Sequence, residues 1–359
     1  MTLPLLTPER TSHPFLTYDM IREIPKGFCA TMKVMEREAT YPLPAPVVFT
    51  GCGTAFFSAR MGSQLLGTAG VRWKATPAFE VEHYERLDGG TVVGVSHSGI
   101  TKATVDSLAR AKKERLLTVG LTHFAGRPIA GVAEKLHVIG DSPDTSRCHT
   151  KTYTSSAAAV MALALRHSEL KEGALEDIAE ELRRLPGDLD KVVSESETSA
   201  REAAESLSGV KKVYLAGAGP NCVTAQEVAL KFKETSYVAA EGFELEEIFH
   251  GHWASADEDT LVVAIPSGRS SAERTRTLLK ASRDLGAETM VVADSEFEAD
   301  YSFRTPAAHG YIVPFLAVIP LYFVSYFVAV NKGHNPDYLR YLEQKYWDAR
   351  QIIFPPGTH

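Results

Sequence analysis

Short apolar runs alternate with longer amphipathic stretches through most of this 359-residue chain. Residues 47–50, for example, are almost entirely apolar, and the stretch from residue 55 to residue 66 then places its apolar side chains at helical spacing. A short apolar run is typical of a buried parallel strand, and spacing of three and four residues indicates a helix. The alternation therefore predicts an α/β fold, with helices on both faces of parallel sheets.

The pattern occurs twice at a nearly constant offset. Val47 and Val213 each begin an apolar strand that runs into Gly-x-Gly, and these two residues lie 166 positions apart. Thr91 and Thr260 begin strands that lead to Ser-Gly, and they lie 169 positions apart. Each half then has a further apolar strand. Repeated landmarks at one offset indicate an internal duplication, which predicts two tandem doubly wound parallel-sheet domains of the flavodoxin-like kind.

These landmarks divide the chain into five segments. The polar stretch at residues 188–205 marks the expected connection between the halves. The segments are an N-terminal helical segment (1–45), a first α/β domain (46–185), a connecting helix (186–208), a second α/β domain (209–333) and a C-terminal tail (334–359).

Composition excludes several classes of partner. The net charge is −7, and the 38 lysines and arginines form no basic run, which argues against nucleic acid. The four cysteines form no CxxC pair, so we expect reduced thiols and a cytoplasmic protein. The N-terminus has no signal-peptide pattern. We expect no metal and no cofactor.

One uncharged segment is long enough to cross a bilayer. It covers residues 311–330 and contains Pro314 and Pro320. A membrane span and a buried core helix have the same hydropathy. Because the segment has no flanking basic cluster and no second segment resembles it, we expect a buried helix and no membrane partner.

The loop at residues 96–101 is a candidate anion site. It reads Ser-His-Ser-Gly-Ile-Thr and lies between a predicted strand and a predicted helix, where ligands of doubly wound sheets bind. Free N–H groups and hydroxyls at a helix N-terminus favour phosphate, although Ser98 or Thr101 could simply cap the helix. The corresponding loop of the second half begins with Pro266. A dinucleotide site is disfavoured, because Phe56 and Cys222 stand where the third glycine is required.

Three charged residues of the second half share one helix face. Glu227, Lys231 and Glu234 are spaced by four and three residues. Such a face is often a solvated surface, but this helix directly follows a Gly-x-Gly turn, so it should face the ligand cleft. Partial burial there would tune Glu234 as a general base. His250 and His252 resemble a metal pair, yet no third ligand with suitable spacing is evident.

At these residues the sequence resembles the double-SIS (sugar isomerase) domain family. Members include the isomerase half of glucosamine-6-phosphate synthase and the stand-alone sugar-phosphate isomerases and deaminases. The similar stretches extend over about residues 47–345. They are residues 51–54, 96–101, 150–154, 227–237, 240–243, 247–251, 320–321 and 333–337.

The resemblance implies a role for each matching residue. Glu234 would move a proton between the first two sugar carbons through an enediol or enolamine, with Lys231 and Glu227 positioning it. His250 would open the sugar ring, entering the site from the neighbouring subunit of a homodimer. The phosphate would be held by Thr54, Ser96, His97, Ser98 and Thr101. Further substrate contacts would come from Gly53, His149, Thr150 and Lys151.

The departures from the family pattern concern the substrate. Ala55 replaces a common phosphate-binding serine and Ile100 a common glutamate. His97 stands where glutamine is usual, and His149 where a small or hydroxyl residue is common. Lys345 is one residue out of step with a lysine that relatives place near the site, so it receives no role.

Four activities remain open at this stage. Two are aldose/ketose isomerisation and deamination of an amino-sugar phosphate, and a deglycase for fructosamine-type phosphates is close to them. The fourth is a non-catalytic sugar-phosphate sensor. Glutamine-dependent synthesis is not expected, because the N-terminus shows neither a cysteine nucleophile nor room for a glutaminase domain. Retention of both Glu234 and His250 favours an enzyme.

Overall fold

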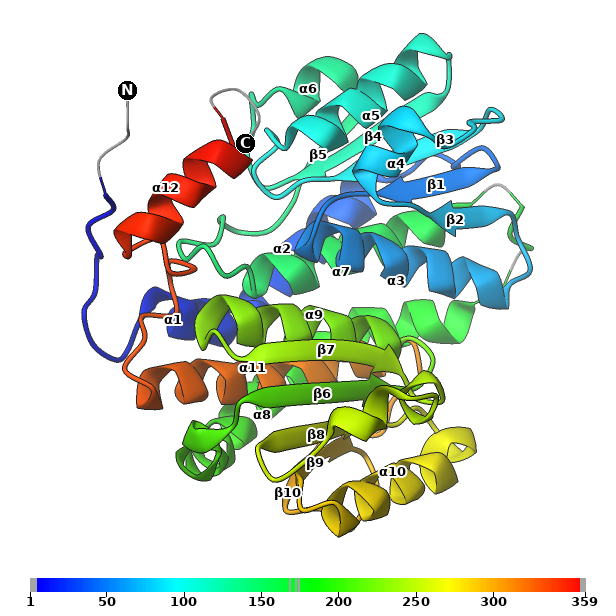
Figure 1. The fold of residues 1–359 in the computed structure, drawn as a ribbon. Helices are drawn as coiled ribbons and strands as arrows, with labels where there is room; N and C mark the ends of the chain where they lie inside the picture. Colours follow the sequence, from blue (N-terminus) through cyan, green and yellow to red (C-terminus); the bar gives the residue numbers. More distant parts are fainter. Residues whose placement is uncertain (1–4, 168, 172, 174, 356–359) are drawn as a thin grey trace.

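Two parallel five-stranded sheets lie at opposite ends of the molecule, with a layer of helices between them (Figure 1). The computed structural model describes residues 5–355 apart from residues 168, 172 and 174. The first sheet has the order β2-β1-β3-β4-β5 and the second the order β7-β6-β8-β9-β10. Both sheets therefore have the same strand order, and the predicted duplication and α/β class are confirmed.

The strands fall close to their expected positions. Those of the first sheet are β1 (Val47–Thr50), β2 (Trp73–Ala75), β3 (Thr91–Val95), β4 (Leu117–Thr122) and β5 (Lys135–Val138). Those of the second sheet are β6 (Lys212–Gly217), β7 (Ala239–Glu244), β8 (Thr260–Ile265), β9 (Glu288–Ala293) and β10 (Tyr301–Arg304). Every residue of β1, β3 and β8 is buried, because helices cover both faces of each sheet.

The helices form three layers around these sheets. The first half contains α1 (Leu16–Arg22), α2 (Ile24–Glu38), α3 (Thr54–Thr68), α4 (Ala78–His83), α5 (Lys102–Lys113), α6 (Ile129–Val132) and α7 (Lys151–Ala164). The remainder contains α8 (Glu176–Ser206), α9 (Asn221–Thr235), α10 (Ala272–Asp284), α11 (Val313–Asn331) and α12 (Gln344–Ile353). Short 3-10 helices η1 to η4 occupy Leu207–Gly209, Glu247–Phe249, His252–Ser255 and Arg269–Ser271.

The Gly-x-Gly turns join each first strand directly to its helix. Gly53 and Gly219 have the same positive φ of 54°, a conformation that favours glycine. A Cβ atom on Gly217 would lie 2.0 Å from the backbone oxygen of Asn221, so this position has no space for a side chain. These tight turns start α3 and α9 at the carboxyl ends of β1 and β6. The two helices then pack against each other in the middle layer (Figure 1).

The long apolar segment is a core helix. In α11, 94% of the most apolar 18-residue window is buried. The helix is long and apolar enough to span a membrane, but it packs against α8 and α9 inside the protein. The expectation of a buried helix is confirmed. Pro320 lies within α11, and Tyr322, two residues later, reaches the site described below.

Two segments differ from the expected outline. The connecting helix α8 begins at Glu176 rather than at residue 186, and it contains Pro186. Its buried residues form a stripe of leucines, valines and alanines that covers the middle layer. The C-terminal tail contains α12, which returns to the first half of the molecule (Figure 1).

Candidate active site

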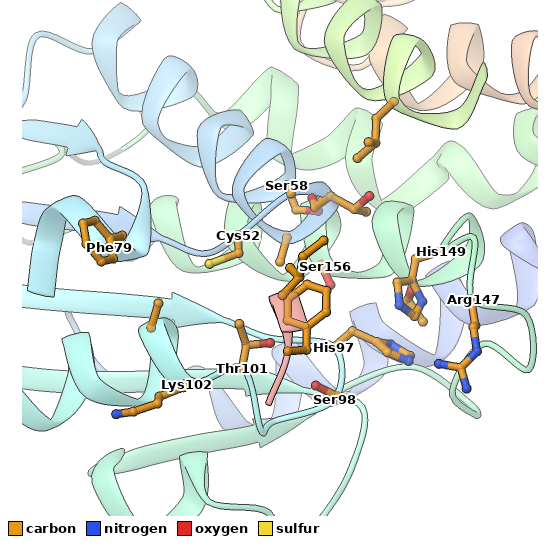
Figure 2. A pocket seen from close by; sticks show the side chains of 18 of the residues that line it. Cys52, Ser58, Phe79, His97, Ser98, Thr101, Lys102, Arg147, His149 and Ser156 are labelled. Atoms are coloured by element: carbon orange, nitrogen blue, oxygen red, sulfur yellow. The ribbon is translucent and has the colours of Figure 1, made fainter. Parts of the chain in front are cut away.

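A cavity of about 800 Å³ opens at the carboxyl ends of the first sheet's strands. Its walls come from the loops after β1 and β3, from residues 147–156, from α9 and from residues 339–354. Figure 2 shows Ser98, Thr101, His97, His149 and Arg147 around the opening. The second half contributes Leu230 and Glu234 from α9, because the middle layer places this helix beside α3. The predicted phosphate loop and the predicted base therefore face one space.

The loop after β3 presents two hydroxyls to the cavity. Ser98 and Thr101 line it. Ser96 is 1% exposed; its hydroxyl donates to Thr101 Oγ1 at 3.1 Å and accepts the N–H of Gly99 at 3.1 Å, so it shapes the loop. Thr101 is the N-cap residue of α5 but makes no side-chain cap hydrogen bond. The simple-cap alternative is therefore wrong for Thr101, and its hydroxyl stays available to a ligand.

A histidine cluster lies beside this loop. The ring of His97 is 4.0 Å from that of His149 and 5.1 Å from that of His123. Burial, followed by the charges of His149 and His123, lowers the pKa of His97 well below its ordinary value. His97 is therefore neutral at neutral pH, and its buried Nδ1 has no partner among the described residues. A neutral imidazole has one donor and one acceptor nitrogen, so it can form hydrogen bonds without adding a charge.

Asp144 fixes the segment that carries His149. Its Oδ2 accepts the backbone N–H of Thr150 at 2.9 Å and the hydroxyl of Thr152 at 2.8 Å. Burial alone would raise the pKa of Asp144, but the interactions with His149 and Thr152 outweigh burial and lower it to about 2. The Nδ1 of His149 lies 3.7 Å from Asp144 Oδ2, a distance too long for a hydrogen bond.

Lys231 joins the two predicted carboxylates in a network. Its Nζ donates to Glu234 Oε2 at 2.7 Å and to Thr54 Oγ1 at 2.9 Å, and it lies 3.3 Å from Glu227 Oε1. The side chains of Lys231 and Glu227 are 1% and 0% exposed, whereas that of Glu234 is 16% exposed and lines the cavity. The three residues thus form a buried network with one carboxylate at its open end, not a solvated surface.

The two carboxylates have different environments. Burial, then the charge of Glu234, raises the pKa of Glu227 from 4.5 to about 7, against the opposing effect of Lys231. Glu227 Oε1 accepts the hydroxyl of Tyr322 at 3.0 Å, and its buried Oε2 has no partner among the described residues. For Lys231, burial alone would lower the pKa, but the charges of both glutamates raise it. Lys231 therefore stays charged and Glu227 is the member that takes up a proton.

We expect Glu227 to make stability depend on pH. The folded-state pKa lies above the unfolded value, so the stabilisation is fully present below pH 4.5 and is lost as the pH rises through about 7. Replacing Glu227 by glutamine keeps the shape and removes this titration. Urea unfolding of the variant should show a flatter dependence between these pH values than the wild-type protein. An unchanged slope would contradict the assignment of the proton to Glu227.

Several predicted site residues lie away from the cavity. The ammonium group of Lys151 pairs with Glu23 at 2.8 Å and with Asp141 at 3.4 Å, and its side chain is 1% exposed. Lys151 therefore makes buried ion pairs and does not line the cavity, although it was expected to contact the substrate. Thr150 is buried at the start of α7 and does not line the cavity. Gly53 and Thr54 do line it, but the Thr54 hydroxyl is engaged by Lys231.

His250 is outside the cavity of its own chain. Its side chain is 66% exposed at the end of η2, and its Nε2 lies 3.8 Å from Glu246 Oε1. Lys345 is also exposed and does not line the cavity. Within the described residues, no group of three or more potential ligands has metal-binding geometry.

Sequence reasoning missed part of the cavity wall. Arg147 lies two residues before His149, the first site residue predicted in this stretch. Tyr341 and Phe354 come from the C-terminal tail. The alternation Arg147-Cys148-His149 in an extended segment was an available signal, because a buried residue between two polar ones places both on the same side. The tail offered no comparable signal, since its position depends on the folding of the whole chain.

Comparisons with known proteins agree with the fold. A family model described as SIS domain matches residues 206–332. Glutamine–fructose-6-phosphate aminotransferase (isomerizing) from Pyrococcus horikoshii is 28% identical over 81% of this chain and 50% of its own length. The Aquifex aeolicus protein of the same name is 29% identical over 94% of this chain and 58% of its own length. The chain thus spans about half the length of the curated relatives it matches.

Solved structures share the whole architecture. The C-terminal domain of glucosamine-fructose-6-phosphate aminotransferase from Francisella tularensis superposes with a TM-score of 0.80 at 20% identity, covering 90% of this chain and 98% of that one. A glucosamine-6-phosphate deaminase from Thermotoga maritima gives 0.74 at 21% identity, covering 90% of this chain and 95% of that one. Tagatose-6-phosphate ketose/aldose isomerase from Escherichia coli gives 0.74 at 18%, covering 92% and 96%. The second half of the chain is thus similar to SIS domains over residues 206–332, and the two halves together have the fold of these solved structures.

Proposed function

We propose that this chain is an enzyme that binds a sugar phosphate and moves a proton between the carbonyl carbon and its neighbour. The observation that carries the proposal is the position of Glu234. Its carboxylate is fixed by Lys231 at 2.7 Å and lines the same cavity as the hydroxyls of Ser98 and Thr101. A phosphate handle and a positioned base in one space are the two requirements of this chemistry.

The phosphate is bound by the loop before α5. Ser98 and Thr101 provide hydroxyl donors, and the N-terminus of this helix adds the favourable end of its dipole. The neutral imidazole of His97, which also lines the cavity, adds one further hydrogen-bonding group. Because the lining lysine of this region, Lys102, is paired with Asp106, the loop itself binds the anion mainly through neutral donors.

Proton transfer is carried out by Glu234. The ionised carboxylate takes the proton next to the carbonyl group and returns it to the adjacent carbon, so an enediol or enolamine forms between the two steps. Lys231 holds the carboxylate in place through a hydrogen bond of 2.7 Å. Glu227, whose pKa is raised to about 7, does not line the cavity. It completes the charge balance of the network.

Ring opening is assigned to His250 of a second copy of the chain. This histidine is exposed and lies outside its own cavity, so it can act only on a neighbouring site. The proposal therefore includes a homodimer with its active sites at the subunit interface. Mixing a Glu234→Gln chain with a His250→Ala chain tests it: mixed dimers should regain activity that neither variant has alone.

A substrate panel separates the possible reactions. Incubation with fructose 6-phosphate, glucosamine 6-phosphate and galactosamine 6-phosphate is followed by assays for ammonia and for ketose/aldose exchange. Ammonia release selects the deaminase and exchange without ammonia selects the isomerase. If wild-type protein and the Glu234→Gln variant bind these compounds alike and are equally inert, the enzyme proposal is wrong and a sensor remains.

We expect Thr101→Val to weaken phosphate binding selectively. The variant removes one hydroxyl donor to a dianion, which should raise the dissociation constant for sorbitol 6-phosphate about tenfold. Titration calorimetry measures the change. Thr277→Val, which makes the same substitution at an exposed position of α10, serves as the matched control. Equal affinities for Thr101→Val and wild type would remove this hydroxyl from the phosphate site.

A further inference from the structure

Two histidines contact each other in the wall of the cavity. His97 comes from the loop after β3 and His149 from the segment before α7, and both line the cavity. Their ring centres lie 4.0 Å apart. The Nδ1 atoms of both rings are buried and have no hydrogen-bond partner among the described residues. This histidine pair therefore has ring nitrogens that are free to accept or donate a proton.

Asp144 is a carboxylate beside the histidine pair. It is buried, and its Oδ2 lies 3.7 Å from His149 Nδ1. Its other oxygen, Oδ1, is also buried and has no partner among the described residues. A third ring, that of His123, lies 5.1 Å from the ring of His97. Burial is the main effect that lowers the pKa of His123 to about 4, so this ring is neutral near neutral pH.

The other charged groups near the pair are cations. Lys151 follows His149 by two residues, and its ammonium group is engaged in two ion pairs with carboxylates. Figure 2 shows Arg147 beside His149, and the charged groups that influence this arginine include no carboxylate. Burial, then the charges of His149 and His123, holds the pKa of His97 well below its ordinary value. In the protein without ligand the surroundings thus disfavour a proton on His97.

The pair adjoins the candidate phosphate loop. His97 directly precedes Ser98, whose hydroxyl lines the cavity with that of Thr101. These hydroxyls carry no charge, and Lys102, the next residue of the loop, is paired with Asp106. A phosphate dianion at Ser98 and Thr101 brings two negative charges close to the imidazole, which favours the protonated ring. The positive charge that the loop lacks can therefore come from solvent as a proton.

We propose that the histidine pair takes up one proton from solvent when the sugar phosphate binds, so that the complex contains an imidazolium beside the phosphate. This inference rests on the proposed function and specifies how its phosphate site acquires charge. The number is one and not two, because like charges on rings 4.0 Å apart repel each other. No covalent bond forms or breaks in this step apart from the N–H bond of the ring.

Proton uptake makes the affinity depend on pH in a defined direction. Between the pKa of the titrating ring in the free protein and its higher pKa in the complex, binding consumes a proton. Each unit by which the pH rises in this range therefore weakens binding about tenfold. The phosphate group of the ligand titrates near pH 6 itself, so the measurement is made above about pH 7.

Calorimetry with sorbitol 6-phosphate counts the proton. Buffers differ in the heat they absorb when they give up a proton, so the slope of binding enthalpy against buffer ionisation enthalpy equals the number of protons taken up. For the wild-type full chain at about pH 7.5 this slope should be about one. The dissociation constant should rise about tenfold between pH 7 and pH 8.

A double variant removes both titrating rings. In His97→Gln/His149→Gln the amides still form hydrogen bonds but take up no proton, so the uptake and the pH dependence should both disappear. His83→Gln is the matched control. His83 also lines the cavity, but its side chain is 44% exposed and lies beside Glu82, at 3.4 Å. This control should keep the full uptake.

Histidine ring-carbon NMR of the wild-type protein gives a second measurement that needs no variant. At constant pH, adding sorbitol 6-phosphate should move ring signals toward the position of the protonated form. Because the spectrum reports the protonation state directly, it stays informative even if the double variant does not fold. Ring signals that stay at the neutral position would contradict the proposal.

The outcomes distinguish this inference from the proposed function. If the wild-type protein binds sorbitol 6-phosphate without proton uptake, the histidine pair proposal is wrong while the proposed function stands. Uptake that persists in the folded double variant, or that is lost in His83→Gln, places the proton elsewhere and also overturns the proposal. If the wild-type protein does not bind sorbitol 6-phosphate, the proposed function fails and this inference fails with it.

Discussion

Replacing Glu234 by glutamine should lower turnover by about 10²–10⁴-fold while sugar-phosphate affinity changes little. The amide has nearly the same shape as the carboxylate and can still contact Lys231, so the cavity keeps its form. It cannot accept a proton from carbon. Initial rates with the substrate that the panel identifies, and calorimetry with sorbitol 6-phosphate, measure the two quantities separately.

Two further variants serve as controls for this measurement. Glu202→Gln makes the same change at an exposed position of α8 and should leave turnover unchanged. Glu234→Asp keeps the carboxylate but withdraws it by one methylene group, so it should be slower than wild type and faster than the glutamine variant. Turnover of Glu234→Gln within a few-fold of wild type would show that another group is the base.

Replacing Lys231 by methionine should cost about 3–5 kcal/mol of stability, because the variant breaks a buried charge network by removing one partner. Lys231 is 1% exposed, and without it Glu227 and Glu234 face each other with no cation between them. Urea unfolding at pH 8 measures the loss. The deficit should shrink as the pH is lowered through about 7, since protonation of Glu227 removes its repulsion with Glu234.

The controls for this prediction lie on the same helix. Lys233→Met changes an exposed lysine of α9 and should change stability by less than about 0.5 kcal/mol. In the double variant Lys231→Met/Glu227→Gln, one of the two buried acids is neutral, so part of the lost stability should return. A Lys231→Met protein as stable as wild type would contradict the buried network.

The architecture was predictable because it depends on local patterns that occur twice. The strands that begin at Val47 and Val213 are apolar throughout, and each is followed by a glycine pair that only a tight strand-to-helix turn requires. The shared strand order follows from this duplication. The start of α8 was less predictable, since residues 176–187 contain Pro186 and the helix continues through it because its leucine stripe is buried.

The site was predictable where one element carries it. Glu227, Lys231 and Glu234 occupy one face of α9, and Ser98 and Thr101 occupy one loop, so spacing alone placed them. Lys151 shows the opposite case. Its motif resembles a substrate contact, but Glu23 from the N-terminal segment reaches its ammonium group, and no local pattern predicts a partner so distant in sequence.

Arg147 was missed for a similar reason. Its importance lies in the absence of a carboxylate partner among the described residues and in its place beside Tyr341, which the tail brings back across the cavity. Both features are properties of the folded chain. The sequence could predict a candidate phosphate loop and a candidate base, but the rest of the cavity wall is assembled from distant segments.

The most direct test of the central claim is a crystal structure of the protein with sorbitol 6-phosphate, an open-chain phosphate that cannot react. We expect its phosphate oxygens about 3 Å from the hydroxyls of Ser98 and Thr101, and its first two carbons next to the carboxylate of Glu234. A phosphate bound at Arg147 instead, or a sugar chain that leaves Glu234 without contact, would contradict the account.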